Sequence, residues 1–210
     1  MTIAFVNFAT AGYYKEASRD LVKSIHEHCP DAVVFSFNRF EDIASPSHTD
    51  NPYAFKLYAI DYVRKLGYDL IVWCDSPVRL TQPIDAWIPE IEAVGVYLQR
   101  DGWKVGQWAN DKALEAFKVS RDEMMQKDTC SAGLIGFDFK NPVAVKFFDM
   151  WWNAHKQGLF KGAWKNDRGT ESADPRCLGH RHDQTCCELT CYALGIPFQP
   201  SVMGRFFKQW

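Results

Sequence analysis

The order of hydrophobic and polar positions near the start of the chain predicts alternating strands and helices. Residues 3–8 form an apolar run, which is typical of a strand buried on both faces. Residues 15–28 carry apolar side chains at the spacing of a helix with one buried face, and Pro30 ends that helix. Residues 32–37 predict a second strand. A strand, a helix and a strand in this order predict a right-handed crossover and a parallel pair.

The next helix and strand place an acid in a position where ligands often bind. Residues 56–67 predict a helix that stops at Gly67, and residues 70–73 predict another buried strand. Asp75 follows directly. In open α/β sheets ligands bind just outside the carboxyl ends of the strands, and a carboxylate there can hold a hard cation that binds a diphosphate. The alternative is that Asp75 only opens a turn, since Asp-Ser-Pro is ordinary turn chemistry.

The rest of the chain continues the mixture of both kinds of element without a linker or a repeat. The pattern predicts a short amphipathic segment at 84–91, strands at 94–98 and 130–138, short helices at 111–117 and 120–126, a long helix at 142–155, a loop at 157–178 and a helix from about 183 to 194. We therefore expect one α/β domain over residues 1–210.

Composition narrows the choice of function classes. The chain has 210 residues and a formal net charge of -2, without a basic run, which argues against general nucleic-acid affinity. No apolar stretch approaches the roughly 20 residues of a membrane helix, and the first residues do not resemble a signal peptide. Seven cysteines are an odd number for a disulfide framework, so we expect reduced thiols and a cytoplasmic protein.

Candidate ligand contacts occur where the predicted strands end. Thr10 and Tyr13 follow the first strand, so the hydroxyl can hydrogen-bond to a nucleotide and the ring can stack on it; a plain strand-to-helix turn is the alternative. Lys56 falls in the first turns of its helix and can point at a diphosphate, although such a lysine is often simply solvated. Ser131, Ala132 and Gly133 are small enough to let the backbone approach a bulky ligand.

The segment from 180 to 184 concentrates chemically active side chains at the start of the last helix. His180 or His182 can complete a cation site with Asp75, and Arg181 can offset phosphate charge. Asp183 and Gln184 can meet sugar hydroxyls or orient an acceptor. The alternative for Asp183 is helix capping.

The cysteines offer a different interpretation of the same region. Soft ligands gather in the sequence here, and they could build a structural zinc site: Cys177, His180, His182, Cys186, Cys187 and Cys191. The spacing matches no paired Cys-x-x-Cys pattern, and free cysteines often pack as small hydrophobes.

The order of these segments resembles small glycosyltransferases of the GT-A nucleotide-sugar fold, closest to the family-8-like enzymes. The resembling segments span nearly the whole chain: residues 6–13, 52–56, 68–78, 130–135 and 180–184. The resemblance implies a mixed, mostly parallel sheet flanked by helices. It also implies that Asp75 belongs to a DxD metal motif, that residues 131–133 line the donor sugar, and that Asp183 and Gln184 lie near the transferred sugar. One departure is clear, because Pro77 replaces the second acid of DxD; either His180 or His182 substitutes for it, or metal binding is weak.

The resemblance implies a glycosyltransferase with a nucleotide-diphosphate sugar as donor and Mn²⁺ or Mg²⁺ at Asp75. The acceptor stays open between a glycan, a protein side chain and a modified nucleobase. Asp183 or Gln184 would stabilise the sugar cation in a retaining reaction, and Asp183 would be the general base in an inverting one. Two alternatives remain at this point: a non-catalytic nucleotide-sugar binder on the same fold, and a zinc-stabilised binding module.

Overall fold

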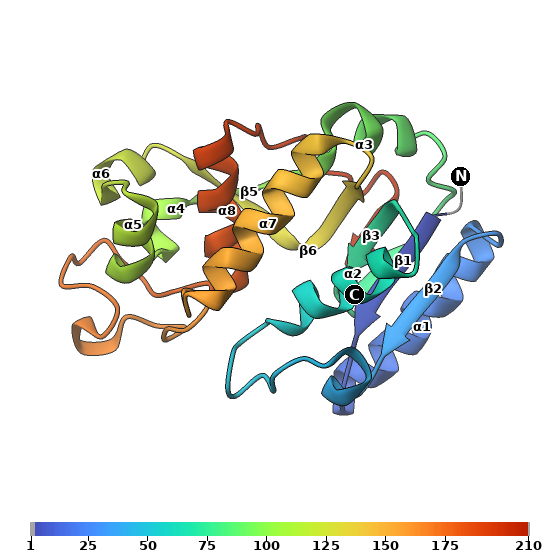
Figure 1. The fold of residues 1–210 in the computed structure, drawn as a ribbon, viewed down its shortest axis with the longest axis horizontal. Coiled ribbons are helices and arrows are strands. Elements are labelled where there is room, and N and C mark those ends of the chain that lie inside the picture. Colours follow the sequence, from blue (N-terminus) through green and yellow to red (C-terminus); the bar gives the residue numbers. More distant parts are fainter. Residues whose placement is uncertain (1–2, 210) are drawn as a thin grey trace.

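The computed structural model describes residues 3–209, which form a central sheet with helices on both faces (Figure 1). The strands are β1 (Ile3–Phe8), β2 (Val33–Phe37), β3 (Leu70–Cys74), β4 (Val78–Leu80), β5 (Val96–Lys104), β6 (Asp128–Asp138) and β7 (Phe207–Gln209). The helices are α1 (Gly12–His28), α2 (Phe55–Lys65), α3 (Ile88–Val94), α4 (Val105–Trp108), α5 (Asp111–Phe117), α6 (Arg121–Met124), α7 (Pro142–Lys156) and α8 (Asp183–Leu194), with short 3₁₀ turns at Phe40–Ile43 and Asp167–Gly169.

The main sheet has the strand order β2-β1-β3-β6-β5. β1 pairs in parallel with β2 on one side and with β3 on the other. β6 is antiparallel to both β3 and β5, so β6 runs against the other strands of this sheet. The predicted α/β class with a mixed, mostly parallel sheet is therefore confirmed.

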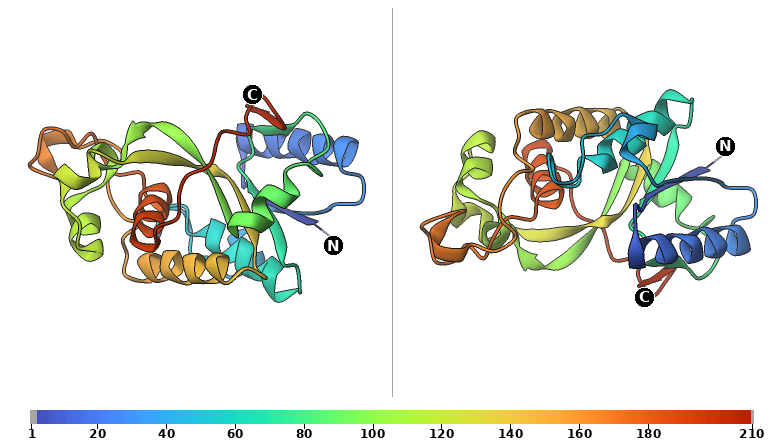
Figure 2. Two further views of the ribbon diagram at one scale, coloured as in Figure 1. Left: turned by 90° about the horizontal axis from the view of Figure 1, so that it is seen from above. Right: turned by 90° about the horizontal axis from the view of Figure 1, so that it is seen from below.

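Alternating residues of the strands supply two separate hydrophobic cores. Ile71 and Trp73 of β3 face the core shared with α2, α7 and α8, whereas Leu70 and Val72 face the core shared with α1 and α3. Figure 2 shows α1 on one side of the sheet and α2 with α7 on the other. Burial on both faces explains why the first and third strands read as continuous apolar runs in the sequence.

The strand order decides where a ligand can bind. The chain leaves β1 through α1 to reach β2, while β3 lies on the opposite side of β1. The carboxyl ends of β1 and β3 thus point to the same edge at a switch in strand order, which is where open α/β sheets bind ligands. The predicted neighbourhood of Thr10 and Asp75 follows from this arrangement.

One strand is longer than the sequence predicts. The strand predicted at 94–98 is β5, which starts at Val96 and continues to Lys104 through irregular pairing with β6. At the end of the described chain, β7 returns to pair with β4 and brings Met203 and Gln209 to the ligand-binding edge.

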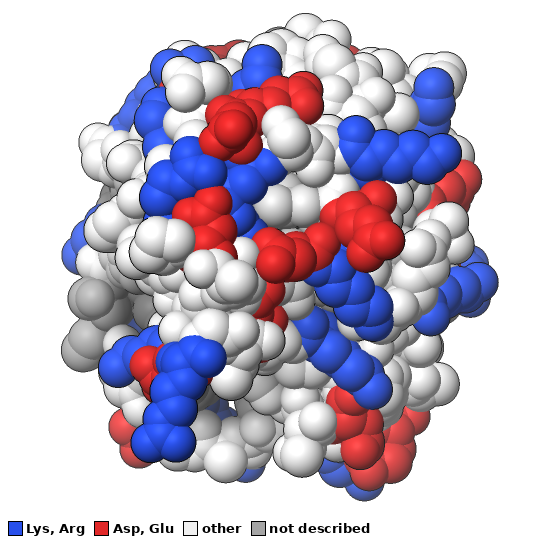
Figure 3. All heavy atoms as spheres, turned by 90° about the vertical axis from the view of Figure 1, so that its left-hand side faces the viewer, with Lys and Arg blue, Asp and Glu red and all other residues white. Residues whose placement is uncertain are grey.

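The outer surface of the lobe formed by α5 and α6 is mixed in charge. Figure 3 shows blue and red side chains interleaved on this face. Arg176 pairs with both Asp122 and Asp174, and Arg121 pairs with Asp111. This face therefore offers no extended patch of one sign.

Across residues 3–209, no helix combines the length and the apolar character that crossing a membrane requires.

Candidate functional site

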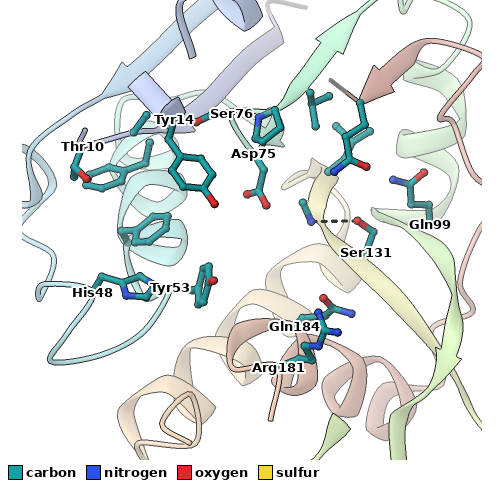
Figure 4. Close-up of a pocket in the computed structure, with 18 of the residues that line it drawn as sticks. Thr10, Tyr14, His48, Tyr53, Asp75, Ser76, Gln99, Ser131, Arg181 and Gln184 are labelled. Carbon is teal, nitrogen blue, oxygen red and sulfur yellow. Dashed lines mark hydrogen bonds between the residues drawn. The ribbon is translucent and has the colours of Figure 1, made fainter. Parts of the chain in front are cut away.

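A cavity of about 740 Å³ opens at the carboxyl ends of β1 and β3. Its size lies in the range of small-molecule sites. Figure 4 shows Asp75 on one side of this space, with Arg181 and Gln184 of the α8 region on the other. Much of the wall comes from the β1–α1 loop, the segment before α2, the β3–β4 turn, residues 131–134 of β6 and the start of α8, and other parts of the chain complete it, among them Gln99, Trp164 and Met203.

One end of the cavity is aromatic. The ring of Phe8 lies 4.6 Å from that of Phe55 and 4.9 Å from that of Phe40, measured between centroids. Thr10 and Tyr14 line the adjoining wall. A flat apolar surface next to hydroxyl groups can take a planar ring that also carries polar edges.

Thr10 lies where the sequence predicts it, but Tyr13 does not. Tyr13 is 53% exposed and is absent from the cavity wall, whereas Tyr14 lines the wall and directs its hydroxyl into the space (Figure 4). α1 begins at Gly12, and consecutive helical residues point about 100° apart. The start of the helix thus decides which of the two tyrosines faces the ligand.

Lys56 joins the two acids that the sequence places far apart. Its Nζ lies 2.9 Å from Asp183 Oδ2 and 3.4 Å from Asp75 Oδ1, and it donates a hydrogen bond of 2.9 Å to the Ala132 carbonyl. The Lys56 side chain is buried. Burial acts to lower the pKa of this ammonium, but the carboxylates of Asp183 and Asp75 outweigh burial and raise the pKa above its ordinary value. Lys56 therefore stays charged and organises the acids instead of extending into the cavity as predicted.

Asp183 is the first residue of α8, and its carboxylate turns toward Lys56. No side-chain hydrogen bond caps this helix. The structure therefore does not support the alternative that Asp183 caps this helix. Because Asp183 is 3% exposed, its charge acts on the cavity from behind the wall.

The backbone of residues 131–133 packs directly on Asp75. The amide of Asp75 donates a 2.7 Å hydrogen bond to the Gly133 carbonyl. A Cβ at Gly133 would lie 3.1 Å from Asp75 Oδ2, so glycine gives the carboxylate room. Ser131 and Gly133 line the cavity. Ala132 does not, because its side chain packs in the core and its carbonyl is held by Lys56.

Gln184 lines the cavity with a fixed orientation. Its Nε2 donates a 3.0 Å hydrogen bond to Oε1 of the fully buried Glu188. The same Glu188 oxygen accepts a 3.1 Å hydrogen bond from the Cys130 amide. Because Glu188 holds the amide nitrogen, the Gln184 carbonyl oxygen is the atom left for the cavity.

Arg181 also lines the cavity, and its guanidinium lies between two indole rings. Its Cζ is 3.9 Å from the ring centre of Trp108 and 4.1 Å from that of Trp164. Arg181 was predicted as a substrate contact, and its place in the wall fits that prediction. The two indole rings that enclose Arg181 were not predicted from the sequence.

The structure does not bring His180 or His182 together with Asp75. The ring nitrogens of His180 meet the Leu159 carbonyl at 2.8 Å and the Asn110 amide at 3.4 Å. Nδ1 of His182 lies 2.9 Å from the Phe160 carbonyl. Both imidazoles fix the backbone of the long loop behind the wall.

Two non-glycine residues beside the cavity have left-handed backbones. Tyr53 has a φ of 58° and His182 has a φ of 53°, and their rings lie 5.4 Å apart. Such conformations cost about 1–3 kcal/mol each and collect at functional sites. Ala44, Lys118 and Arg168 also have positive φ but do not line the cavity, so this feature alone does not identify the site.

The cysteines do not assemble the alternative zinc site. All seven are free, and the Cys177 and Cys186 thiols contact backbone carbonyls. Within residues 3–209, no group of three or more His, Cys, Asp or Glu side chains is placed to hold a metal ion.

Comparison with solved structures identifies the fold. Mouse xyloside xylosyltransferase 1 aligns over 96% of this chain and 85% of its own length, with a TM-score of 0.51 at 10% identity. The bifunctional glycosyltransferase WbbM aligns over 72% of this chain but only 34% of its own, with a TM-score of 0.48 at 16% identity. The galactosyltransferase LgtC, solved with donor and acceptor sugar analogues, aligns over 75% of this chain and 64% of its own, with a TM-score of 0.42 at 13% identity.

The chain has a GT-A-like glycosyltransferase fold. No model of a known family matches the sequence. No curated protein matches it either. At these identities the structural likeness establishes the fold alone, and the chemistry has to be argued from the site.

The GT-A-like fold raises the question of a divalent cation at Asp75. Oδ1 of Asp75 already accepts a 2.8 Å hydrogen bond from Trp73 Nε1 and lies 3.4 Å from the Lys56 ammonium. Pro77 contributes no donor, and Asp183 is paired with Lys56. The protein side chains therefore do not fit the set of oxygen ligands that Mg²⁺ or Mn²⁺ prefers.

Several residues of this GT-A-like site escaped the sequence-based prediction. Tyr53, His48 and Trp164 lie in loops whose path the sequence does not specify, and Phe40 lies in a short 3₁₀ turn. The one available signal is Pro52 before Tyr53, which marks the entry into α2. Glu188 could have been suspected as a charged residue in an otherwise apolar helical stretch.

Proposed function

We propose that this protein is a glycosyltransferase that moves a sugar from a nucleotide-diphosphate sugar to an acceptor. The observation that carries the proposal is the joining of Asp75 and Asp183 through one buried ammonium, directly behind a ligand-sized cavity. Burying charged side chains costs folding free energy, so stability alone is a poor explanation for a buried ion cluster. The GT-A-like fold supports the same activity.

The aromatic end of the cavity suits the nucleobase. Phe8 and Phe40 offer flat apolar faces, and the hydroxyls of Thr10 and Tyr14 offer hydrogen bonds to the base or the ribose. The diphosphate would then lie across the β3–β4 turn between Ser76 and Arg181. The donor sugar would rest against Ser131 and Gly133, where the missing side chain of glycine leaves space.

Gln184 is suited to the reacting centre. When the bond between the anomeric carbon and the diphosphate oxygen breaks, the electron pair stays with the diphosphate and the sugar becomes electron-poor. The Gln184 carbonyl oxygen, held by Glu188, presents a partial negative charge to that sugar. Asp183 adds a fixed negative charge from behind the wall.

The burial of Asp183 favours one route for the acceptor proton. A general base must reach the acceptor hydroxyl, but Asp183 is 3% exposed and paired with Lys56. An oxygen of the leaving diphosphate is a better-placed base for that proton. We therefore propose the retaining course, in which Asp183 stabilises charge and does not abstract the proton.

The test is release of nucleoside diphosphate from a panel of nucleotide sugars, with glycan, peptide and nucleoside acceptors. We expect turnover by the wild-type protein and a loss of roughly 100-fold or more in Gln184→Ala, with donor binding retained. Tyr13→Phe, outside the cavity, is the matched control and should keep full activity. Absence of turnover with every donor and acceptor would contradict the proposal.

A second candidate is a binder of nucleotide sugars without catalysis. Pro77 favours it, because the second acid of the metal motif is missing from this GT-A-like site. Such a protein would bind the same donors but would release no nucleoside diphosphate.

A further inference from the structure

Two cations approach the cavity, and they differ in what neutralises them. Lys56 is shared between two carboxylates. Within residues 3–209, no ion pair joins Arg181 to an acid, and its Nε is buried without a hydrogen-bond partner. The faces of its guanidinium are occupied by Trp108 and Trp164, so its edge is the part left for a ligand.

The clamp around Arg181 is built into the fold. The Trp108 carbonyl accepts hydrogen bonds from the Arg181 amide at 3.2 Å and from Thr185 Oγ1 at 2.5 Å, which holds the backbone of Trp108 at the start of α8. The backbone of Trp164 packs closely on Gly179, since a Cβ at Gly179 would clash with the Trp164 carbonyl. A guanidinium stacked in this way loses little further freedom when it binds an anion.

The charged side chains in the cavity wall are suited to an anionic ligand. Among the described residues that line the cavity, Arg181 supplies the lysine or arginine charge and Asp75 the carboxylate charge. Burial lowers the pKa of Arg181, and the more distant charges of Asp101 and Glu188 only partly offset this effect. An oxyanion with at least two oxygens, such as a phosphate or a carboxylate, fits the planar fork of donors.

We propose that Arg181, clamped by Trp108 and Trp164, binds the leaving diphosphate and takes the place of a protein-held divalent cation, so that sugar transfer proceeds without added metal. This rests on the proposed transferase function. As the anomeric C–O bond breaks, its electron pair moves onto the diphosphate oxygen. The N–H groups of Arg181 then donate to the increasingly negative oxygens, and Arg181 keeps all its protons.

The proposal explains the departure at Pro77. A metal site with one carboxylate, whose Oδ1 already meets Trp73 and Lys56, would be weak. A fixed guanidinium needs no second acid. Trp108 and Trp164 act as positioning residues because they hold the fork without touching the reacting atoms.

The experiment measures calorimetric affinity for a nucleoside and for its diphosphate in EDTA, for the wild type, Arg181→Lys and Arg181→Met. We expect about a 10- to 100-fold loss of diphosphate affinity in both variants, with nucleoside affinity unchanged. Lysine keeps the charge but loses the stacked, two-pronged geometry. Arg19→Lys, on the exposed side of α1, is the matched control. Thermal melts confirm that each variant is folded.

Turnover in EDTA completes the test. We expect wild-type turnover to persist in EDTA and to fall in Arg181→Lys, mainly through kcat. Activity or diphosphate binding that disappears in EDTA and returns with Mn²⁺ would overturn the inference, as would Arg181 variants that bind diphosphate normally. If Arg181 instead holds a carboxylate of the sugar or acceptor, diphosphate affinity is unchanged and turnover of the anionic substrate alone falls. Absence of all turnover by the wild type would refute the proposed function instead.

Discussion

The two sides of the cavity treat a positive charge in opposite ways. On the α2 side, Lys56 is buried and shared between Asp75 and Asp183. On the α8 side, Arg181 is stacked between two indoles and keeps its donors for a ligand. The first arrangement holds the architecture together, and we propose that the second recognises substrate. Cations with the same charge thus take different roles according to what satisfies them.

The largest effect should come from breaking the Lys56 side. Lys56→Met would leave two acids without their counter-ion, one of them deeply buried, and we expect a loss of about 3–5 kcal/mol in the free energy of unfolding. Urea denaturation measures this loss. The double variant Lys56→Met/Asp183→Asn removes one charge of each sign and should recover part of it. A loss below about 1 kcal/mol in Lys56→Met would contradict a structural role.

Of the two sides of the cavity, the Arg181 side should lose more folding stability as the pH falls. Burial lowers the pKa of His180, next to Arg181, to about 4, against an ordinary value of 6.5. In the unfolded chain His180 therefore binds a proton at a higher pH than in the folded protein. The contribution of neutral His180 to the free energy of unfolding is fully present above pH 6.5. It is lost as the pH falls toward 4, by up to about 3 kcal/mol.

Unfolding curves between pH 7 and pH 4 check this prediction. His180→Asn should flatten the fall in stability relative to the wild type, whereas the exposed His26→Asn should leave it unchanged. Equal slopes in the wild type and His180→Asn would show that other groups cause the acid sensitivity.

A smaller effect should come from removing Glu188, which orients the Gln184 amide. Glu188→Ala removes the acceptor that orients the Gln184 amide, and we expect about a tenfold fall in kcat with donor affinity retained. In a Gln184→Ala background the same change should have no further effect on kcat. A full additional loss in that background would mean that Glu188 acts through packing alone.

The smallest effect should lie at the aromatic end. Tyr14→Phe removes a hydroxyl that points into the cavity, so nucleotide affinity should fall about threefold. Tyr13→Phe, one position earlier, should not change it. Binding calorimetry of the two variants distinguishes these neighbours, and the reverse result would mean that α1 presents the other tyrosine to the ligand.

Much of the fold is encoded in local patterns. The runs that became β1 and β3 were recognisable because strands buried on both faces contain few polar residues, and the stop of α8 at Gly195 follows from a left-handed backbone. Strand direction was harder to predict. Whether β6 runs with or against β3 depends on the path of the intervening 50 or so residues, which no local pattern specifies.

The site was only partly predictable for the same reason. Asp75 and Asp183 were recognisable by residue type and position, but their shared partner Lys56 depends on how α2 packs beneath β3. His180 and His182 look like metal ligands in sequence. Their nitrogens instead meet carbonyls of the loop around Leu159, a contact over some 20 residues that spacing does not reveal.

The most direct test is the crystal structure of the protein with an unreactive nucleotide-diphosphate sugar analogue. We expect the base against Phe8 and Phe40, the diphosphate between Ser76 and Arg181, and the anomeric carbon within about 3–4 Å of the Gln184 carbonyl oxygen. An analogue bound elsewhere, or with its diphosphate directed away from Arg181 and its sugar away from Gln184, would contradict this expectation.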